Sequence, residues 1–406
     1  MSWPVVRLGD IFEREVGGIS FSRDQFSESG IPVVPKKAIS SDVQIDNSNL
    51  VYTPPNIAEK YAQYSVDNSF LITTLRDLVP TGPNLGRICE INAPHDFLLA
   101  QGVYAFKLCG KVHPKYLCYF SNSNLFRKQV LQAKVGSTQV HIRSSEFKAV
   151  EIPLPPLPEQ KRIAAILDKA DAIRRKRQQA IQLTDEFLRA VFLDMFGDPV
   201  TNPKGWEVKP LAFGIESITS GWSAKGESYP CKSGELGVLK ISSVTSGKFN
   251  PQENKLVHGD SIPEGKCLVF PRKGDLLFSR ANTRELVAAT CIVPKDQHSV
   301  FLPDKLWKVK TNANFLLPEF LNYLIWEPKF KEKLTSQATG TSGSMLNISK
   351  GKLEATDAIF PDLSLQNKFG SIFWTIQKTL TSLKESRDGL DIVFSSLSQK
   401  SFSGEL

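Results

Sequence analysis

Three polar loops in the first half of the chain carry side chains of the types that bind nucleic acids. They are PKKAIS at 35–40, TTLRD at 73–77 and KVGSTQVHIRSS at 134–145. Arginine and lysine bind phosphates or guanine, glutamine and asparagine bind adenine, and serine, threonine and glycine let the backbone come close. Similar loops follow in the second half, LKISSV at 239–244, FSRANTRE at 278–285 and ATGTSGSMLNIS at 338–349. A single loop of this kind is explained equally well as a solvated turn, but recurrence favours binding.

The side chains that we expect to contact DNA are polar and largely basic. In the first half they are Lys36, Lys37, Arg76, Lys134, Ser137, Thr138, Gln139 and Arg143. In the second half they are Lys240, Arg280, Asn282, Arg284, Ser342 and Ser344. The formal net charge of +8 also favours a polyanionic partner, although only modestly.

The sequence contains no constellation that predicts catalysis. Neither the phosphate-binding pattern G-x-x-x-x-G-K-[ST] nor the zinc pattern H-E-x-x-H occurs, and the chain has five histidines. Cys109, His113 and Cys118 lie close in sequence, but a zinc site needs four ligands at matching spacing. Asp304 and the EPK segment at 327–329 have the spacing of a metal nuclease, and we interpret this as chance. We therefore predict no metal site and no catalytic residue.

The composition is that of an ordinary globular protein with more than one domain. The chain has 406 residues, of which 41% are hydrophobic and 23% charged. Six cysteines without a C-x-x-C pair are expected to be reduced. No signal peptide and no apolar run long enough to span a bilayer is found, which predicts a cytoplasmic protein without a membrane partner.

The chain repeats itself at an interval of about half its length. PLPPLPEQKRIAAIL at 153–167 resembles FPDLSLQNKFGSIFW at 360–374, and Gln160 pairs with Gln366 at an offset of 206. Other matching segments have offsets between 203 and 206, as in FLLAQGVYAFK at 97–107 and VFLPDKLWKVK at 300–310. Such a narrow range of offsets indicates a tandem duplication with short loop insertions.

Each repeat is expected to consist of a globular α+β part and a long helix. Short β-rich runs and one helical patch near 114–133 and 318–338 predict a mixed sheet in each globular part. Long helices are predicted from about Pro158 to Phe196, where no helix breaker follows the first turn, and from Leu365 to Phe402, where the second copy of the segment begins. The expected domains are 1–152, a helical segment at 153–202, 203–358 and a helical segment at 359–406.

Apolar residues spaced three and four apart run along both predicted helices. The positions expected in this stripe, or beside it in contact with another subunit, are Ile163, Ile166, Leu167, Ala170, Ile173, Phe187, Val191, Phe369, Ile372, Ile376, Leu383, Leu390, Val393 and Leu397. We expect the two stripes to pack as an antiparallel coiled coil. Positions outside the stripe, namely Leu167, Leu188, Phe192, Phe373, Leu380 and Phe394, would then remain uncovered for another protein. The alternative is that they pack on the globular part that precedes each helix.

The segment IPLPPLPEQKRIAAILDKADAI at 152–173, its second copy, LDMFGDP at 193–199 and SFSGEL at 401–406 resemble the specificity subunits of type I restriction-modification systems. The resemblance covers the whole chain in the order recognition domain, helix, recognition domain, helix. It implies a non-catalytic subunit with two target recognition domains, each of which binds one half of a bipartite site in double-stranded DNA. The helices would set the gap and dock two methyltransferase subunits, through which restriction and translocase subunits join the complex.

The resemblance also implies that this chain binds no cofactor, and that S-adenosylmethionine, ATP and Mg²⁺ bind to the partner subunits. The second copy departs from the family pattern, because Leu365 stands where the first copy has Glu159. That departure puts in doubt whether the two methyltransferase contacts are equally strong. Two other hypotheses stay open at this point. One is a stand-alone DNA-binding regulator, and the other is a nuclease or methyltransferase in its own right, which the absent catalytic motifs oppose.

Overall fold

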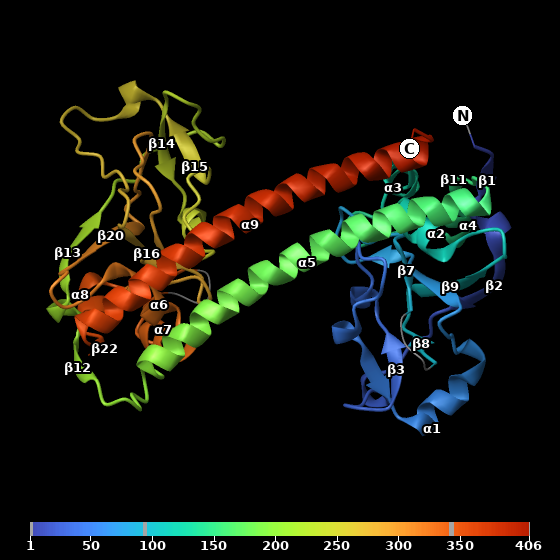
Figure 1. Ribbon diagram of the computed structural model, residues 1–406, viewed down its shortest axis with the longest axis horizontal. Helices are drawn as coiled ribbons and strands as arrows, with labels where there is room; N and C mark the ends of the chain where they lie inside the picture. The colour runs from blue at the N-terminus through green and yellow to red at the C-terminus, as the bar shows by residue number, and fades with distance from the viewer. Residues whose placement is uncertain (1–2, 92–95, 341–344, 406) are drawn as a thin grey trace. The chain divides into compact units, whose positions relative to one another are not determined.

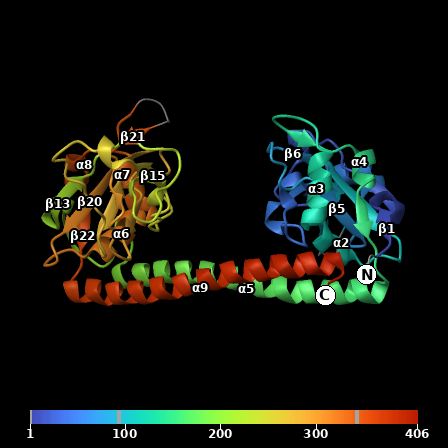
Figure 2. The same ribbon diagram turned by 90° about the horizontal axis from the view of Figure 1, so that it is seen from above.

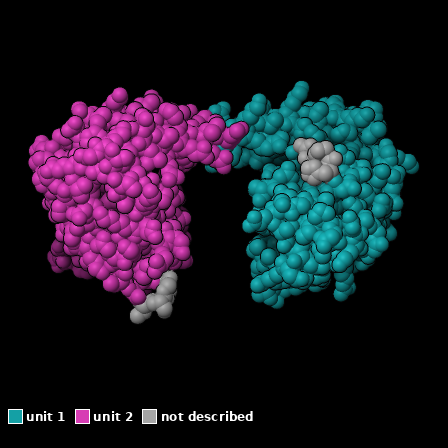
Figure 3. Space-filling model, turned by 90° about the horizontal axis from the view of Figure 1, so that it is seen from below, with its two compact units in different colours: residues 1–178, 385–406 teal, residues 179–384 magenta. Residues whose placement is uncertain are grey.

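The computed structural model describes residues 3–91, 96–340 and 345–405 and divides the chain into two compact units (Figures 1 and 3). Unit 1 comprises residues 1–178 and 385–406, and unit 2 comprises residues 179–384. Each unit therefore contains a globular part and a portion of both long helices.

Unit 1 has a four-stranded antiparallel sheet in the order β2-β9-β5-β7 and a three-stranded sheet in the order β4-β3-β8. Two further strand pairs, β1-β11 and β6-β10, complete it. The strands are β1 (Val5–Arg7), β2 (Phe12–Gly17), β3 (Ile31–Val34), β4 (Val51–Thr53), β5 (Phe70–Thr74), β6 (Arg76–Asp77), β7 (Ile88–Glu90), β8 (Leu98–Leu99), β9 (Val103–Leu108), β10 (Val140–His141) and β11 (Glu151–Pro153). The short helices are α1 (Pro55–Ala58), α2 (Pro114–Ser121), α3 (Asn124–Gln132) and α4 (Ser144–Lys148).

Unit 2 has sheets with the orders β13-β20-β16-β18 and β15-β14-β19, together with the pairs β12-β22 and β17-β21. The strands are β12 (Glu207–Pro210), β13 (Ile215–Ser220), β14 (Leu236–Leu239), β15 (Asn254–Val257), β16 (Leu276–Ser279), β17 (Ala281–Asn282), β18 (Thr290–Ile292), β19 (Val300–Phe301), β20 (Leu306–Thr311), β21 (Leu346–Asn347) and β22 (Asp357–Phe360). The short helices are α6 (Pro318–Trp326), α7 (Pro328–Thr335) and α8 (Lys350–Glu354). The mixed helix and sheet content confirms the predicted α+β class.

The single helical patch expected in each globular part is in fact two helices. In unit 1 the break follows Ser121, and the Ser123 side chain accepts a hydrogen bond from the backbone N–H of Phe126 at the start of α3. In unit 2, Pro328 begins α7 at the position where α6 ends. A serine N-cap and a proline at the first helical position each favour a new helix start over continuation.

The long helices α5 (Leu157–Phe196) and α9 (Leu363–Ser403) confirm the two helices expected from the sequence. Gln160 and Gln366 are fully buried near their first turns. The Gln160 side chain accepts a hydrogen bond from the His113 N–H at 2.8 Å and donates to the carbonyls of Lys111 and Pro155. Gln366 makes the same kinds of bond to Leu317, Phe315 and Pro361. The repeated glutamine thus fixes each helix start to the loop before α2 or α6.

Within each unit the long helices pack on that unit's globular part (Figure 2). In unit 1, Ile163 and Leu167 of α5 and Phe402 of α9 join the core of the sheet and α2. In unit 2, the ring of Phe192 lies 5.6 Å from Phe320 of α6 and 5.4 Å from Phe369 of α9. The end of α5 and the start of α9 therefore share one apolar core in unit 2.

The apolar positions that are buried on the two long helices differ from those expected from the sequence. Three residues of the predicted stripe, Ile173, Phe187 and Val393, are exposed. Most positions expected to be uncovered are buried in the unit cores, namely Leu167, Leu188, Phe192, Phe373 and Leu380, while Phe394 is half-buried. The sequence places apolar residues on two adjacent helix faces, and the globular parts cover the face that we expected to be free. The stated alternative holds for Leu167, Phe373 and Leu380, which pack on the globular part that precedes their helix. Leu188 and Phe192 of α5 instead pack on the globular part of unit 2, and Phe394 of α9 packs on that of unit 1.

None of the helices in the described ranges is long and apolar enough to cross a membrane.

Candidate nucleic-acid interface

Strand pairing joins two of the predicted loops in unit 1. β6 from the loop at 73–77 pairs with β10 from the loop at 134–145, and His141 lies opposite Arg76. The buried hydroxyl of Thr74 donates hydrogen bonds to the carbonyls of Arg76 and Gly102, which fixes the turn before β6. β6 lies on the side of unit 1 away from the long helices (Figure 2).

The third predicted loop meets the other two at Gly102. A Cβ atom at this position would lie 3.2 Å from Cδ of Lys36 and 3.5 Å from Cβ of Arg76. Gly102 has a φ of +89°, which other residues rarely adopt. The chain thus turns closely between the two basic side chains, and all three predicted loops of unit 1 converge.

A cavity of about 300 Å³ opens where these loops meet. Its lining includes Arg76, Gln101, Tyr104, His141 and Arg143. Arg76 and Arg143 are exposed, and no carboxylate in the described part of the chain pairs with either guanidinium. Because their donors are not occupied by the protein, both arginines can bind phosphate or a base edge.

The remaining candidates of unit 1 lie around this cavity's loops. Lys36 is half-buried, and Lys37, Ser137, Thr138 and Gln139 are exposed. The loop that holds the last three closes through reciprocal backbone hydrogen bonds between Val135 and His141. Lys134 differs, because its ammonium group donates to the Pro80 carbonyl at 2.8 Å and so supports the loop.

In unit 2 strand pairing again joins two predicted loops. β17 from the loop at 278–285 pairs with β21 from the loop at 338–349. Asn282 is half-buried on β17, and Arg284 is exposed without a side-chain partner among the described residues. Ser342 and Ser344 lie outside the described residues. Lys240 is 3.8 Å from Glu253, so its charge is partly offset within the protein.

Arg280 does not lie free in the way expected of a direct DNA contact. Its guanidinium donates to the Asp304 carbonyl and lies 3.0 Å from the Asp304 carboxylate. The hydroxyl of Ser223 donates to the other oxygen of that carboxylate. Burial alone would raise the pKa of Asp304, but the hydrogen bonds from Ser223 and Arg280 outweigh it and the pKa lies below its ordinary value. The carboxylate is therefore held ionised in one orientation.

Sequence reasoning missed several polar residues of these two sites. In unit 1 they are Gln101, Tyr104 and His141, and in unit 2 they are Ser223, Asp304 and Asn347. The matching segments at 97–107 and 300–310 already aligned Gln101 with Asp304. That alignment was the available signal, because a polar position repeated beside a predicted loop merits attention.

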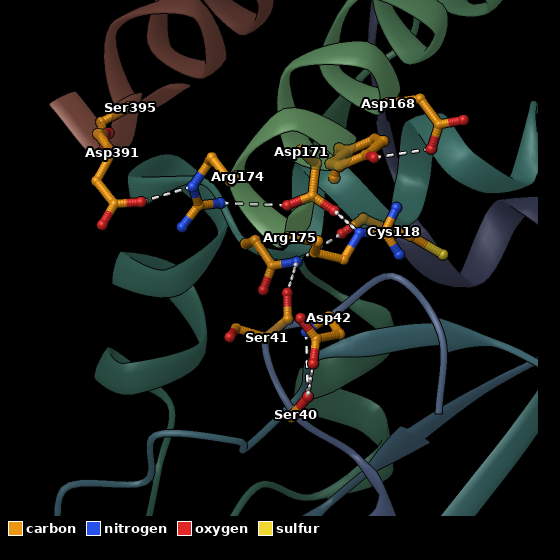
Figure 4. Close-up of polar contacts among 12 residues, drawn as sticks. Ser40, Ser41, Asp42, Cys118, Asp168, Asp171, Arg174, Arg175, Asp391 and Ser395 are labelled. Carbon is orange, nitrogen blue, oxygen red and sulfur yellow. Dashed lines mark hydrogen bonds and ion pairs between the residues drawn. The ribbon is translucent and has the colours of Figure 1, made fainter. Parts of the chain in front are cut away.

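Arg174 and Arg175, the first two residues of the basic run at 174–177, belong to a polar cluster of unit 1 (Figure 4). Arg174 lies 2.6 Å from Asp391 of α9 and 3.2 Å from Asp171 of α5. Arg175 also pairs with Asp171, whose side chain is largely buried. Arg174 further covers the Phe394 ring at 4.4 Å. Arg174 thus joins the two long helices within unit 1, while Arg175 pairs with Asp171 of its own helix.

Both long helices also present exposed apolar side chains. Phe187 is 58% exposed and Ile392 is 72% exposed, and Ile173, Leu183 and Val393 are more than half exposed. Of the other residues proposed for docking or the coiled coil, Ile163, Leu167, Phe369 and Ile376 are buried. Half-buried positions are Ile166, Ala170, Val191, Ile372, Leu383, Leu390 and Leu397.

Comparison with known proteins gives consistent results. Residues 1–183 match the family described as Type I restriction modification DNA specificity domain. The specificity subunit of the type I restriction enzyme EcoKI from Escherichia coli (strain K12) is 24% identical over 375 residues, which cover 86% of this chain and 77% of that subunit.

Solved structures share the fold of the whole chain. The S subunit of a type I restriction-modification system from M. genitalium superposes with a TM-score of 0.59 at 13% identity, covering 99% of this chain and 96% of that one. A chain from a study of complex assembly and conformational transition in the type I R-M system gives 0.51 at 17% identity, covering 100% and 98%. The chain is thus similar to type I restriction-modification specificity subunits in sequence and in fold.

Proposed function

We propose that this chain is the DNA-specificity subunit of a cytoplasmic type I restriction-modification complex, and that each unit recognises one half of a bipartite site in double-stranded DNA. The observation that carries the proposal is the convergence of the predicted loops. In unit 1 the loops at 73–77 and 134–145 line a cavity with Arg76 and Arg143, and Lys36 of the third loop lies beside Gly102. In unit 2 two loops meet beside Arg280. The unpaired guanidinium groups of Arg76 and Arg143, with the neighbouring Gln101 amide, suit both phosphate and base contacts.

The repeated topology supports recognition of two half-sites by a duplicated module. Both units combine a four-stranded and a three-stranded sheet, and in both the loop after one central strand pairs with a later two-residue strand. We infer that one ancestral module was duplicated. Two copies of one module on one chain are suited to a site with two separated halves.

In this proposal α5 and α9 form an antiparallel pair that sets the unspecified gap between the half-sites. Contacts inside each unit support the pairing, since Arg174 meets Asp391 in unit 1 and Phe192 meets Phe369 in unit 2. Phe192 near the end of α5 meets Phe369 near the start of α9, and Arg174 in the first half of α5 meets Asp391 in the second half of α9. The exposed residues Phe187 and Ile392 are candidates for contact with two methyltransferase subunits.

The chain itself is proposed to be non-catalytic and to bind no cofactor. Methyl transfer from S-adenosylmethionine, and cleavage and translocation with ATP and Mg²⁺, would belong to the methyltransferase and restriction subunits. The test is reconstitution. We expect the purified chain alone to leave DNA unmethylated, and the chain with two methyltransferase subunits to methylate a bipartite site. Methyl transfer by the chain alone would refute the proposal. Tight specific binding without partners would favour a stand-alone regulator.

A further inference from the structure

The guanidinium group of Arg280 makes three contacts within unit 2. Its Nε donates to the Asp304 carbonyl at 3.0 Å, one terminal nitrogen lies 3.0 Å from the Asp304 carboxylate, and the other lies 3.5 Å from the side-chain oxygen of Asn347. An arginine recognises guanine through a free pair of donors. Three of the five N–H groups of Arg280 contact Asp304 and Asn347, so the pair of donors that faces Asp304 cannot also bind a base.

The carboxylate of Asp304 is fixed but not saturated. One oxygen accepts from Arg280 and the other from the hydroxyl of Ser223, which in turn accepts from the Asp304 backbone N–H at 3.3 Å. A carboxylate offers about four acceptor positions, so about two remain. The side chain is 42% exposed. An oriented and accessible acceptor of this kind can receive a hydrogen bond from a ligand.

Asp304 lies beside the loops proposed to contact DNA. Arg280 directly precedes β17 and Asn347 lies on β21, and the ammonium group of Lys305 is 3.6 Å from the Met345 sulfur in the same loop region. Figure 2 shows β21 on the side of unit 2 away from the long helices. Phosphates repel a carboxylate, whereas base amino groups attract one. The chemistry therefore favours a base over the backbone as its ligand.

We propose that Asp304 is a base-specificity determinant of unit 2, accepting a hydrogen bond from the exocyclic amino group of cytosine, and that Arg280 and Ser223 position it. The inference rests on the proposed function and deepens it. Cytosine is favoured over adenine as the ligand. In the major groove the adenine amino group lies next to N7, which is a hydrogen-bond acceptor, and an acceptor beside the second carboxylate oxygen is unfavourable. Arg280, expected to contact DNA directly, becomes a positioning residue.

Unit 1 presents different chemistry at the same structural position. Leu75 donates its backbone N–H to Gly102 and accepts from Ile142, just as Arg280 donates to Lys305 and accepts from Ile348. By this register Leu75 corresponds to Arg280, and Gln101 corresponds to Asp304. Because Leu75 stands where unit 2 has Arg280, no charged side chain at that position fixes Gln101. The Gln101 amide can both donate and accept a hydrogen bond, which suits adenine. The equivalent positions of the two units thus select different bases.

The experiment compares motifs methylated by the reconstituted complex on a library of randomised duplexes. Asp304→Ala should reduce the preference for cytosine at one position of one half-site by about tenfold or more. Asp304→Asn, which keeps the shape and tests the role if alanine impairs folding, should shift that position toward adenine. Ser223→Ala should weaken the cytosine preference without replacing it. Gln101→Ala is the matched control and should alter only the other half-site.

The outcomes separate this inference from the function on which it rests. A wild-type complex that yields no bipartite motif would refute the proposed function. A bipartite motif that stays the same in both Asp304 variants would overturn the inference alone. A change of a guanine preference in Arg280→Met, with no change in the Asp304 variants, would also overturn it, because Arg280 would then contact the base directly.

Discussion

Gln160 shows how one residue in the first turn fixes a long helix, since the 40 residues of α5 span ~60 Å at ~1.5 Å per residue. Its amide is fully buried and makes hydrogen bonds of 2.8, 3.1 and 2.8 Å to three backbone groups. A helix of this length rises by ~1.5 Å per residue, so a small rotation at its start displaces its far end by a much larger distance. The same side chain at Gln366 fixes the second helix.

We expect Gln160→Ala to lower the free energy of unfolding by about 2–3 kcal/mol, because buried backbone groups of His113 and Lys111 lose their partner. Urea denaturation of the purified chain measures the change. Gln178→Ala is the control, since Gln178 is exposed on the same helix, and its effect should stay within about 0.5 kcal/mol. Equal stability of the two variants would show that apolar packing alone holds the helix start.

The two free arginines of the unit 1 cavity make a second prediction at this scale. Arg76→Ala and Arg143→Ala should each weaken binding of the complex to its site by about 1–3 kcal/mol if the arginine contacts a base. If it contacts a phosphate, binding to every sequence should weaken alike and the salt dependence should decrease. Titrations with specific and unrelated duplexes at several salt concentrations distinguish these cases. Lys128→Ala, on exposed α3 surface, is the control, and wild-type affinity in both arginine variants would refute the placement.

At the scale of elements, the sequence predicted the existence and length of α5 and α9 closely. Forty residues without a glycine or proline after the first turn leave little alternative to a helix in α5. It did not predict which face is buried, because Leu188 and Phe187 are adjacent apolar residues and only one can face the core. The globular part of unit 2 covers Leu188 and leaves Phe187 exposed. The spacing of apolar residues within a helix does not show which of two apolar faces a distant globular part will cover.

The ion pairs around Arg174 are expected to stabilise the attachment of α9 in unit 1. Arg174→Ala removes the contact with Asp391 and leaves the buried Asp171 with Arg175 alone. We expect a loss of about 1–2 kcal/mol, because the pair is only partly exposed. Lys176→Ala in the same basic run is the control, as Lys176 is exposed and has no ion pair in the described part of the chain. Thermal unfolding followed by circular dichroism measures the stability of both variants. Equal losses of stability in Arg174→Ala and Lys176→Ala would indicate that the basic run at 174–177 is only a solvated helix face.

The turn after α5 should make unit 2 sensitive to acid. The hydrogen bond from Lys329, with those from the backbone of Val200 and Thr201, lowers the pKa of Asp198 to about 2 from 3.8. The folded-state pKa is depressed, so this stabilisation is complete above about pH 4 and is lost as the pH falls toward 2. Asp198→Asn should remove this part of the pH dependence. Denaturant titrations between pH 2 and 6 test it, and parallel curves for both proteins would contradict it.

At the scale of the whole molecule, the sequence predicted two similar globular parts and the loops that carry their polar residues. It could not predict how those loops meet. β6 and β10 are separated by more than 60 residues, and their pairing brings Arg76 next to His141. The sequence also did not show that Leu75 of unit 1 and Arg280 of unit 2 occupy equivalent positions, because the offset between the repeats changes from loop to loop. Tertiary contacts over long separations decide these details.

The central claim is that two recognition units bind separated half-sites and that the paired helices set the gap. Seven-residue insertions in both helices, after Gln178 in α5 and after residue 384 in α9, would lengthen each by ~10 Å and preserve the heptad phase. That length corresponds to about three base pairs of DNA. The measurement is methylome sequencing of cells that carry the wild-type or the lengthened chain with its methyltransferase subunits.

We predict a bipartite motif with wild-type protein, and the same two half-sites separated by a gap about three base pairs longer with the lengthened protein. An uninterrupted motif, altered half-site bases, or an unchanged gap in an active complex would contradict the account.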